Sequence, residues 1–408
     1  MELPVSLPKE SPFGPSGVPA APMLARHRKL VFVTSGSAWG GVEQHILDIL
    51  QFIDAKSFQV WLLTLAAVDL YSERLPSGQT GVRVISKIPH RSFWAYWRRF
   101  RAIRPDVVIF EAGEIGDFPW YAYWAAKLCG AGRVVDFSHH MRDPGEAAEG
   151  NDPWSRARRL LGWRARHMLD RRLTHRFSDI TAAGSTAVRD NLVHTYGYRE
   201  EEVLVIPYGI DTARFRPAHN AKLALRGGIP RPGEPLLVCV SRLAPHKRID
   251  VLLNALKLLA DQSFVFNCII VGTGNMEAQL KAQRDRLGLA EKVQFAGFVD
   301  DTLPYLQAAD LFVLPSDEEG FGIVLIEAMA CGVPCLAADS GGPRDIITHG
   351  QDGWIVERGS SERFAAAIRS ALADREAVLQ IGRRARETAA QRFSIRRCAE
   401  EIERQLLR

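Results

Sequence analysis

The sequence lacks several features that would restrict its function at once. Its 408 residues contain no run of 18 or more apolar residues, so we expect no membrane-spanning helix. No basic start followed by an apolar run opens the chain, which argues against a secretory signal. The six cysteines follow no familiar metal-binding spacing, and we expect buried free thiols in a reducing cytoplasm. No Asp-x-Asp triplet occurs, so the chain lacks the acidic pair that commonly bridges a metal to a diphosphate.

The overall composition is that of an ordinary globular protein. A net charge of +5 does not by itself indicate nucleic-acid binding, and no recognition module accompanies the basic stretches. Residues 1–27 are rich in proline and poor in large apolar residues, which predicts a disordered tail. Beyond them, short apolar runs alternate with amphipathic patterns. This alternation predicts parallel sheets covered by helices on both faces, in a chain long enough for two or three domains.

The most informative stretch is Leu311 to Ala330, which reads LFVLPSDEEGFGIVLIEAMA. We expect a buried strand at its start, then a turn at Pro315 and a helix. Glu319 and Glu327 flank the start of this helix, where unpaired amides and the helix dipole favour an anion. Glu327 should lie roughly 8 Å along the axis from the helix start. This arrangement suits a nucleotide diphosphate sugar, whose hydroxyls donate to carboxylates, although acids near a helix start are also ordinary capping.

Two predicted strands of the first half end in residues suited to a ligand. Gly40 and Gly41 follow the first strand and would let backbone amides approach a ligand, although a plain tight turn explains them equally well. His139 and His140 follow the strand at residues 133–137, at the sheet edge where ligands gather. A histidine there would hydrogen-bond a sugar hydroxyl or cap a loop. Counting from the strand favours His139.

The second half places two cations and a glycine turn after predicted strands. Arg242 and Lys247 follow the strand at residues 236–240, and both suit phosphate oxygens. Such a pair alone is more often solvated. Gly272 and Gly274 form a Gly-x-Gly turn after the next strand, which is a weak signal by itself.

Two stretches are rich in arginine. Residues 92–104 predict an amphipathic helix with aromatic residues on one face and Arg98, Arg99 and Arg101 mostly elsewhere. Residues 155–176 contain eight arginines and one acid. Such helices can lie on anionic membranes, or they can cover a sheet with a solvated basic edge.

The order of these motifs resembles glycosyltransferase family 4, a group of retaining nucleotide-sugar transferases. Residues 319–327 match the family's E-x7-E signature along its full length. Five further motifs resemble the family's GG-x-E, R-[LF]-x3-K-G, V-G-x-G, V-x-F-x-G and G-G-P-x-E patterns, at residues 40–43, 242–248, 271–274, 293–299 and 340–345. Three positions depart from the family: Tyr208 stands where Asn is common, Arg248 where Gly is usual, and Asp345 where Glu is usual.

The resemblance implies the GT-B fold, in which two Rossmann-like α/β domains with parallel sheets face each other across a cleft. Residues 28–215 would form the acceptor-binding domain and residues 216–391 the nucleotide-sugar-binding domain. Residues 392–408 would form a C-terminal helix that crosses back to the first domain.

The same resemblance implies roles for individual residues. Glu319 would hold the transferred sugar, Arg242 and Lys247 would neutralise the leaving diphosphate, and His139 would lie near the reacting sugar. Glu327 would bind the ribose. The remaining implied donor contacts come from glycine loops, the base-reading segment and the helix start: Gly40, Gly41, Gly272, Gly274, Phe298, Val299, Gly320, Phe321, Gly322 and Ile323.

We therefore expect a cytoplasmic, metal-independent retaining hexosyltransferase, either free or peripherally attached to the inner face of a membrane. It would use a UDP- or GDP-linked sugar and a glycan or lipid-linked acceptor, with no cofactor and no nucleic acid. A GT-B nucleotide-sugar epimerase, a sugar-phosphate phosphorylase and a non-catalytic binding subunit of a polysaccharide assembly complex remain alternatives.

Overall fold

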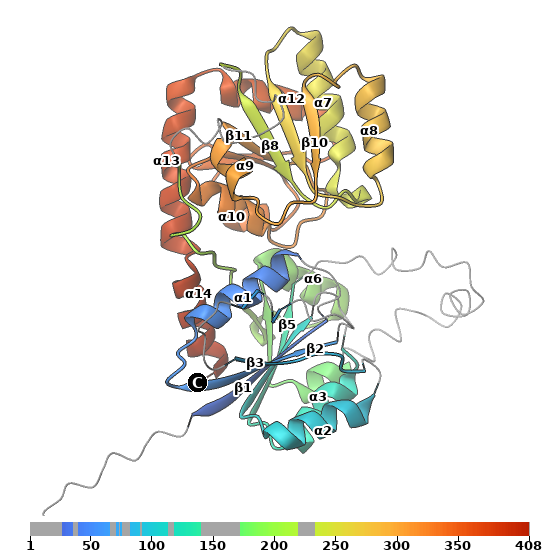
Figure 1. The fold of residues 1–408 in the computed structure, drawn as a ribbon, viewed down its shortest axis with the longest axis vertical. Coiled ribbons are helices and arrows are strands. Elements are labelled where there is room, and N and C mark those ends of the chain that lie inside the picture. Colours follow the sequence, from blue (N-terminus) through green and yellow to red (C-terminus); the bar gives the residue numbers. More distant parts are fainter. Residues whose placement is uncertain are drawn as a thin grey trace, which may run out of the picture.

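The computed structural model describes residues 27–35, 40–65, 71–72, 74–75, 82–89, 92–112, 118–139, 172–218 and 233–407. These residues form two α/β domains, one above the other (Figure 1). Three predicted features lie outside the described residues. They are the expected tail up to residue 26, His140, and residues 155–171 of the basic stretch.

The first domain is built on a parallel sheet of seven strands in the order β3-β2-β1-β4-β5-β6-β7. Its strands are β1 (Arg28–Thr34), β2 (Phe58–Thr64), β3 (Val82–Ile85), β4 (Val107–Ala112), β5 (Arg133–Ser138), β6 (Ile180–Ala183) and β7 (Val203–Val205). Its helices include α1 (Gly41–Phe52), α2 (Phe93–Ile103), α3 (Trp120–Leu128), α6 (Thr186–Tyr196) and the 3₁₀ turn η2 (Glu200–Glu202).

Strand β1 shows why this sheet is covered on both faces. Its residues are apolar without alternation, and successive side chains of a strand point to opposite faces. Leu30 and Phe32 pack into the core shared with α1, whereas Val31 and Val33 pack into the core shared with α2 and α3. All four side chains are fully buried.

The second domain repeats this plan with six parallel strands in the order β10-β9-β8-β11-β12-β13. Its strands are β8 (Leu236–Val240), β9 (Asn267–Val271), β10 (Val293–Gly297), β11 (Leu311–Leu314), β12 (Cys335–Ala338) and β13 (Gly353–Val356). Its helices are η4 (Pro245–Lys247), α7 (Ile249–Asp261), α8 (Glu277–Arg286), α9 (Leu303–Ala308), α10 (Ile323–Ala330), α11 (Pro343–Ile346), α12 (Ser361–Leu372) and α13 (Arg375–Arg392).

Both sheets reverse their strand order at one point, between β1 and β4 in the first domain and between β8 and β11 in the second. Ligands of open parallel sheets bind outside the carboxyl ends of the strands at such a point. The predicted fold class, two Rossmann-like domains with parallel sheets, is confirmed.

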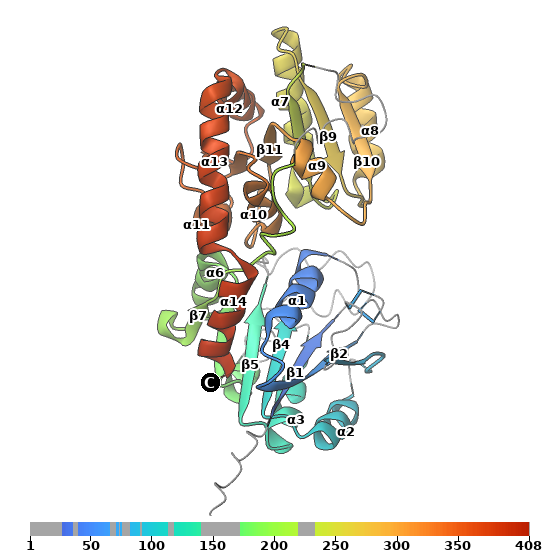
Figure 2. The same ribbon diagram turned by 60° about the vertical axis from the view of Figure 1, so that its left-hand side comes forward.

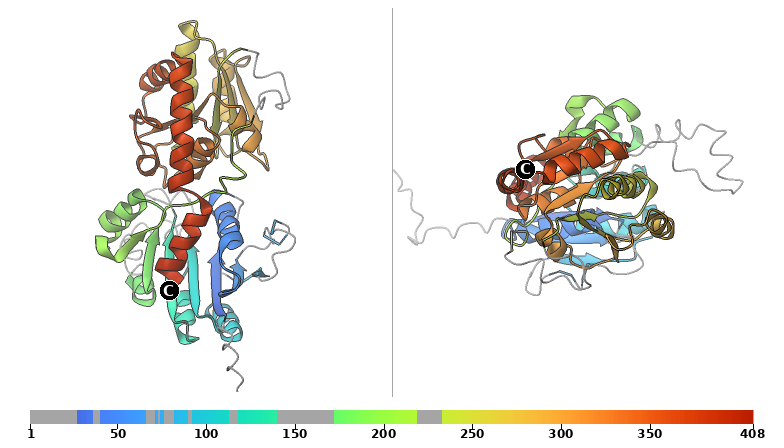
Figure 3. Two further views of the ribbon diagram at one scale, coloured as in Figure 1. Left: turned by 90° about the vertical axis from the view of Figure 1, so that its left-hand side faces the viewer. Right: turned by 90° about the horizontal axis from the view of Figure 1, so that it is seen from above.

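The chain crosses between the domains twice, and the two crossings are paired. The Ile210 amide donates to the Phe393 carbonyl at 2.9 Å, and the Ile395 amide donates to the Ile210 carbonyl at 2.8 Å. Helix α14 (Ile395–Ile402) then packs beside α1, and its residues Ile395 and Ile402 are buried in the first domain's core (Figures 2 and 3). The C-terminal helix expected within residues 392–408 begins at Ile395 and ends in a π-helical turn, η5 (Glu403–Leu407).

The structure corrects one predicted strand boundary. The apolar run from Phe264 to Val271 predicts a strand over that whole range, whereas strand β9 starts at Asn267. The Phe264 amide donates to the Leu259 carbonyl, and Ser263 adopts a φ of 56°, so these residues close the end of α7.

Two further expectations can be compared with the structure. The cysteines are free, and all but the half-buried Cys129 are buried, as predicted. Among the described residues, no helix is long and apolar enough to cross a bilayer.

Candidate active site

The carboxyl ends of β8 and β11 bring the predicted cations and the predicted sugar-binding carboxylate together. Lys247 Nζ lies 2.8 Å from Glu319 Oε2, and both side chains are largely buried, with about 15% of each exposed. Main-chain hydrogen bonds fix the Glu319 segment, since its amide donates to the Ser340 carbonyl and its carbonyl accepts from the Gly342 amide. Arg242 is exposed at the same edge of the sheet.

Glycines allow two backbone segments to approach each other at this edge. A Cβ on Gly272 would lie 2.0 Å from the Ser241 carbonyl oxygen, and one on Gly274 would lie 2.3 Å from the Leu243 carbonyl oxygen. Gly272 also has a φ of +125°, which side chains rarely adopt. The loops after β8 and β9 therefore pack backbone against backbone beside the cations.

The start of helix α10 lies opposite the start of α1 in the other domain. Gly322, with a φ of 99°, turns the chain into α10, and the first residue of that helix is Ile323. A Cβ on Gly41 would lie 3.3 Å from the Ile323 side chain, so the glycine pair adjoins the helix start. Burial raises the pKa of Glu43, and electrostatic interactions with the nearby His139 and Arg242 oppose this shift.

Glu327 lies one turn into α10 and is half-buried. Burial raises the pKa of its carboxyl group to about 7, with Arg214 opposing this shift and Asp48 and Asp301 adding to it. Hydrogen bonds donated by hydroxyl groups would stabilise the charged form of this carboxylate and lower its pKa.

His139 is enclosed in a buried polar network. Its Nε2 lies 2.6 Å from Glu111 Oε2, and its Nδ1 contacts the Tyr208 hydroxyl. Phe137 stacks on its ring with centroids 4.9 Å apart. Both ring nitrogens are thus engaged within the protein, so a hydrogen bond to a ligand requires one of these contacts to open.

Contacts between the domains surround the signature segment. The Tyr208 ring packs against Phe321 with centroids 5.0 Å apart, and the Ser185 hydroxyl donates to the Gly320 carbonyl. Asp345 accepts from the Thr186 amide at 2.6 Å. A carboxylate of the second domain therefore caps α6 of the first, at the helix end that favours negative charge.

The base-reading candidates lie at the end of β10, near the glycine turn. The Gly272 amide donates to the Gly297 carbonyl at 2.8 Å, which joins β10 to the Gly272–Gly274 turn. Phe298 is 59% exposed and Val299 is half-buried. Within the described part of the chain, no group of three or more His, Cys, Asp or Glu side chains is arranged to hold a metal ion.

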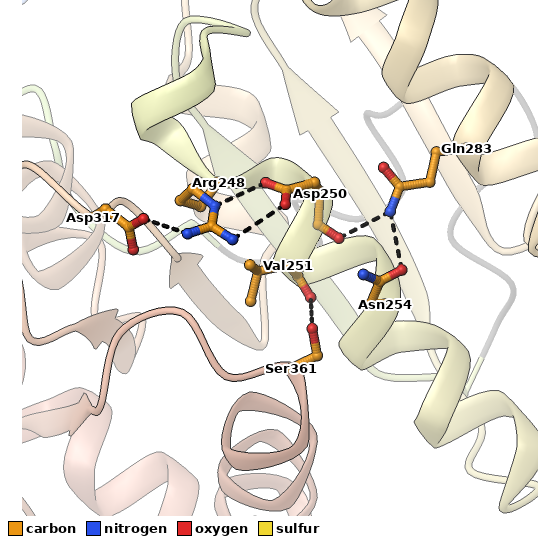
Figure 4. Close-up of polar contacts among 7 residues, drawn as sticks. All are labelled: Arg248, Asp250, Val251, Asn254, Gln283, Asp317 and Ser361. Atoms are coloured by element: carbon orange, nitrogen blue, oxygen red, sulfur yellow. Dashed lines mark hydrogen bonds and ion pairs between the residues drawn. The ribbon is translucent and has the colours of Figure 1, made fainter.

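Arg248, which departs from the family's glycine, joins the two site loops (Figure 4). Its φ of 49° places it in the left-handed region, which explains why glycine is usual here. Its guanidinium forms ion pairs with Asp317 in the signature loop and with Asp250 in the first turn of α7. The Asp317 amide also donates to the His246 carbonyl at 2.9 Å. These contacts hold the segments that carry Lys247 and Glu319 side by side.

Replacing Arg248 by Ala should destabilise the protein by roughly 1 kcal/mol more than replacing it by Gly, because only Ala keeps a Cβ in a left-handed conformation. Denaturant unfolding of both variants measures the difference. At Arg384, in the middle of α13, the order should reverse, since Ala favours a helix interior over Gly. Equal stability of the two Arg248 variants would contradict the strained backbone.

Several site contacts have only weak signals in the sequence. Glu111 is the one acid in the otherwise apolar strand VVIFEA, and that position could have marked it. Thr186 and Asp317 carry no comparable signal, because their partners lie far away in the chain.

Solved structures with the same architecture include glycosyltransferases. Anabaena HepE in complex with UDP superposes with a TM-score of 0.76 at 23% identity, covering 93% of this chain and 99% of that one. WaaG, a glycosyltransferase involved in lipopolysaccharide biosynthesis, gives a TM-score of 0.68 at 19% identity over 92% of this chain and 99% of that one. The chain therefore has the GT-B fold.

Sequence comparison identifies the family. The model for Glycosyltransferase Family 4 matches residues 39–214, and the model for Glycosyl transferases group 1 matches residues 225–388. Together these models span most of the chain, which belongs to glycosyltransferase family 4.

Two groups of relatives are about one third identical to this chain over the part that aligns. A GDP-mannose-dependent alpha-(1-6)-phosphatidylinositol monomannoside mannosyltransferase of Mycobacterium tuberculosis is 34% identical over 219 residues, or 52% of this chain and 57% of that protein. A D-inositol 3-phosphate glycosyltransferase of Geodermatophilus obscurus is 36% identical over 211 residues, or 49% of this chain and 46% of that protein. The chain thus spans about half the length of these relatives.

Proposed function

We propose that this protein is a retaining glycosyltransferase that moves a hexose from a nucleotide diphosphate sugar to a hydroxyl group of a glycan or lipid-linked acceptor. The observation that carries the proposal is the Lys247–Glu319 pair beside the start of α10. A cation, a carboxylate and free helix amides meet there at the switch point of a parallel sheet, and this combination suits a diphosphate joined to a sugar.

In this proposal the donor lies across the carboxyl edge of the second sheet. Arg242, Lys247 and the amides that follow Gly320 bind the diphosphate and stabilise the negative charge that develops as it leaves. Glu319 accepts hydrogen bonds from hydroxyls of the transferred sugar, and Glu327 accepts them from the ribose. The base lies against the backbone at Phe298 and Val299.

The proposal assigns no general base to the protein. The acceptor attacks from the face on which the leaving phosphate lies, so that phosphate takes the acceptor proton and the anomeric configuration is kept. Tyr208 and Phe321 pack at the junction of the domains, and the closed junction would limit access of water to the donor.

The relatives support a sugar nucleotide as donor but do not fix which one. The mycobacterial relative is named as GDP-mannose-dependent, and HepE has been crystallised with UDP-glucose. We therefore propose a UDP- or GDP-linked hexose that is used without a metal ion or other cofactor.

A panel of UDP, GDP and ADP with the wild-type protein tests the donor class. A nucleotide that binds the folded state raises the melting temperature, by an amount that grows with its concentration relative to its dissociation constant. We expect a clear shift with one of these nucleotides. The matching nucleotide sugars, offered with candidate acceptors, should then release nucleoside diphosphate, and NMR of the product should show a retained anomeric configuration.

Two of the alternatives have distinct outcomes in this experiment. A protein that binds a nucleotide but turns over no donor, whatever the acceptor, would favour a binding subunit. Conversion of the free nucleotide sugar to its epimer would favour an epimerase. Absence of any nucleotide-dependent shift would overturn the proposal.

A further inference from the structure

Helices α2 and α3, together with Phe177, carry a continuous series of aromatic rings in the first domain. Neighbouring rings lie 5.2 to 6.1 Å apart between centroids. We call this series the aromatic track, and it runs in the order Trp97, Trp94, Phe93, Trp124, Trp120 and Phe177. Phe93, Trp97 and Phe177 also pack against the core cluster on this side of the sheet, whereas Trp94 and Trp124 do not belong to it.

Two rings of the aromatic track, Trp94 and Trp124, are exposed to an extent that packing does not explain. Trp94 is 63% exposed, Trp124 is 37% exposed, and Leu128 beside them is 54% exposed. They are the only exposed large apolar side chains among the described residues of the first domain. A concentration of exposed apolar side chains on one face indicates an interaction surface.

Positive charge is interleaved with these rings. Trp94, Trp97, Arg98 and Arg101 lie three, four and seven residues apart and so share one face of α2. The Arg101 guanidinium lies 4.9 Å from the centre of the Trp97 ring. Neither helix contains an acidic residue. The face therefore combines tryptophan, whose ring is amphipathic, with unbalanced positive charge.

We propose that this face of α2 and α3 docks on an anionic lipid bilayer. The aromatic track lies at the level of the lipid headgroups, where tryptophan is favoured, and Arg98 and Arg101 bind lipid phosphates. A second copy of the chain fits less well, because a symmetric contact through this face would place arginines against arginines without an acid between them.

The position of this surface separates docking from the proposed chemistry. Helices α2 and α3 lie at the end of the first domain that points away from the second domain (Figures 1 and 2). Lys247 and Glu319 belong to the second domain, so changes on α2 and α3 leave the candidate donor site intact. Docking can therefore be measured whether or not the protein transfers sugar.

Flotation with lipid vesicles tests the proposal. The wild-type protein is mixed with vesicles of phosphatidylcholine alone, or of phosphatidylcholine with roughly a third phosphatidylglycerol, at low and high salt. We expect binding to the anionic vesicles only, weakened by salt. The double variants Trp94→Ser with Trp124→Ser, and Arg98→Glu with Arg101→Glu, should each bind at least roughly tenfold more weakly.

The matched control lies on α13 of the second domain. The double variant Leu379→Ser with Arg384→Glu removes a leucine that is 52% exposed and an exposed arginine. Neither residue belongs to the proposed surface. This variant should bind vesicles as the wild-type protein does. Circular dichroism melts identify any variant that has lost its fold, and the single changes Trp94→Ser and Arg98→Glu then replace it in the comparison.

Three outcomes would overturn the proposal. The first is equal flotation of the wild-type protein and both α2–α3 variants, or no flotation at all. The second is that light scattering shows a dimer for the wild-type protein and a monomer for the variants, while the wild-type protein binds no vesicles. The third is binding to a single-stranded oligonucleotide that the variants lose, again without vesicle binding.

Discussion

Replacing Glu319 by Gln should lower the rate of sugar transfer by roughly a hundredfold or more, while the affinity for the free nucleoside diphosphate stays unchanged or rises slightly. In the proposal this carboxylate holds the transferred sugar, so its loss affects the step in which that sugar moves. Its partner Lys247, at 2.8 Å, would no longer share its charge with an acid and would remain free for phosphate. Turnover assays and calorimetric titration of the nucleotide measure the two effects.

Glu387→Gln, on the exposed side of α13, is the matched control and should change neither quantity. A Glu319→Gln protein that loses nucleotide affinity in proportion to its activity would contradict the assignment. In that case the carboxylate would act by positioning the phosphate-binding groups, and the proposed contact between Glu319 and the sugar would be wrong.

Replacing Lys247 by Met should have the opposite signature and weaken both binding and transfer. A hydrogen bond to a charged group contributes about 1.5–3 kcal/mol, so nucleotide affinity should fall by roughly ten- to a hundredfold. Transfer should fall further, because negative charge on the phosphate grows as the bond to the sugar breaks. The variant also leaves Glu319 without its ion-pair partner in a largely buried setting, which adds some loss of stability.

Lys257→Met removes a surface ion pair with Asp261 on α7 and serves as the control, since such exposed pairs contribute little. Nucleotide affinity is compared at several salt concentrations, and its salt dependence should be weaker in the Lys247 variant. An unchanged affinity for the nucleoside diphosphate, in a variant that remains folded, would exclude Lys247 as a phosphate ligand.

Local sequence patterns predicted much of the fold. Strands such as β8 and β11 are uninterrupted apolar runs, and a strand buried on both faces needs this composition. Strands β12 and β13 were not predicted. They have four residues each, and β12 contains two alanines, so neither stands out from its surroundings.

The candidate site was predicted in outline, because its glycines, cations and acids follow strands in fixed order. Contacts across long separations in the chain were not predicted. The Tyr208 hydroxyl contacts His139, and Asp345 caps the helix that begins at Thr186. The Tyr208–His139 contact joins residues 69 positions apart, and the Asp345–Thr186 contact depends on how the two domains meet, so no local pattern encodes either one. The departure at Arg248 is explained by its left-handed backbone together with its ion pair to Asp317, and the sequence shows neither of them.

A crystal structure of the protein with its preferred sugar nucleotide tests the central claim most directly. The account predicts that the diphosphate lies between Arg242, Lys247 and the amides that follow Gly320, with the sugar directed toward Glu319. Density for the nucleotide elsewhere, or a diphosphate bound with both basic side chains turned into solvent, would contradict it.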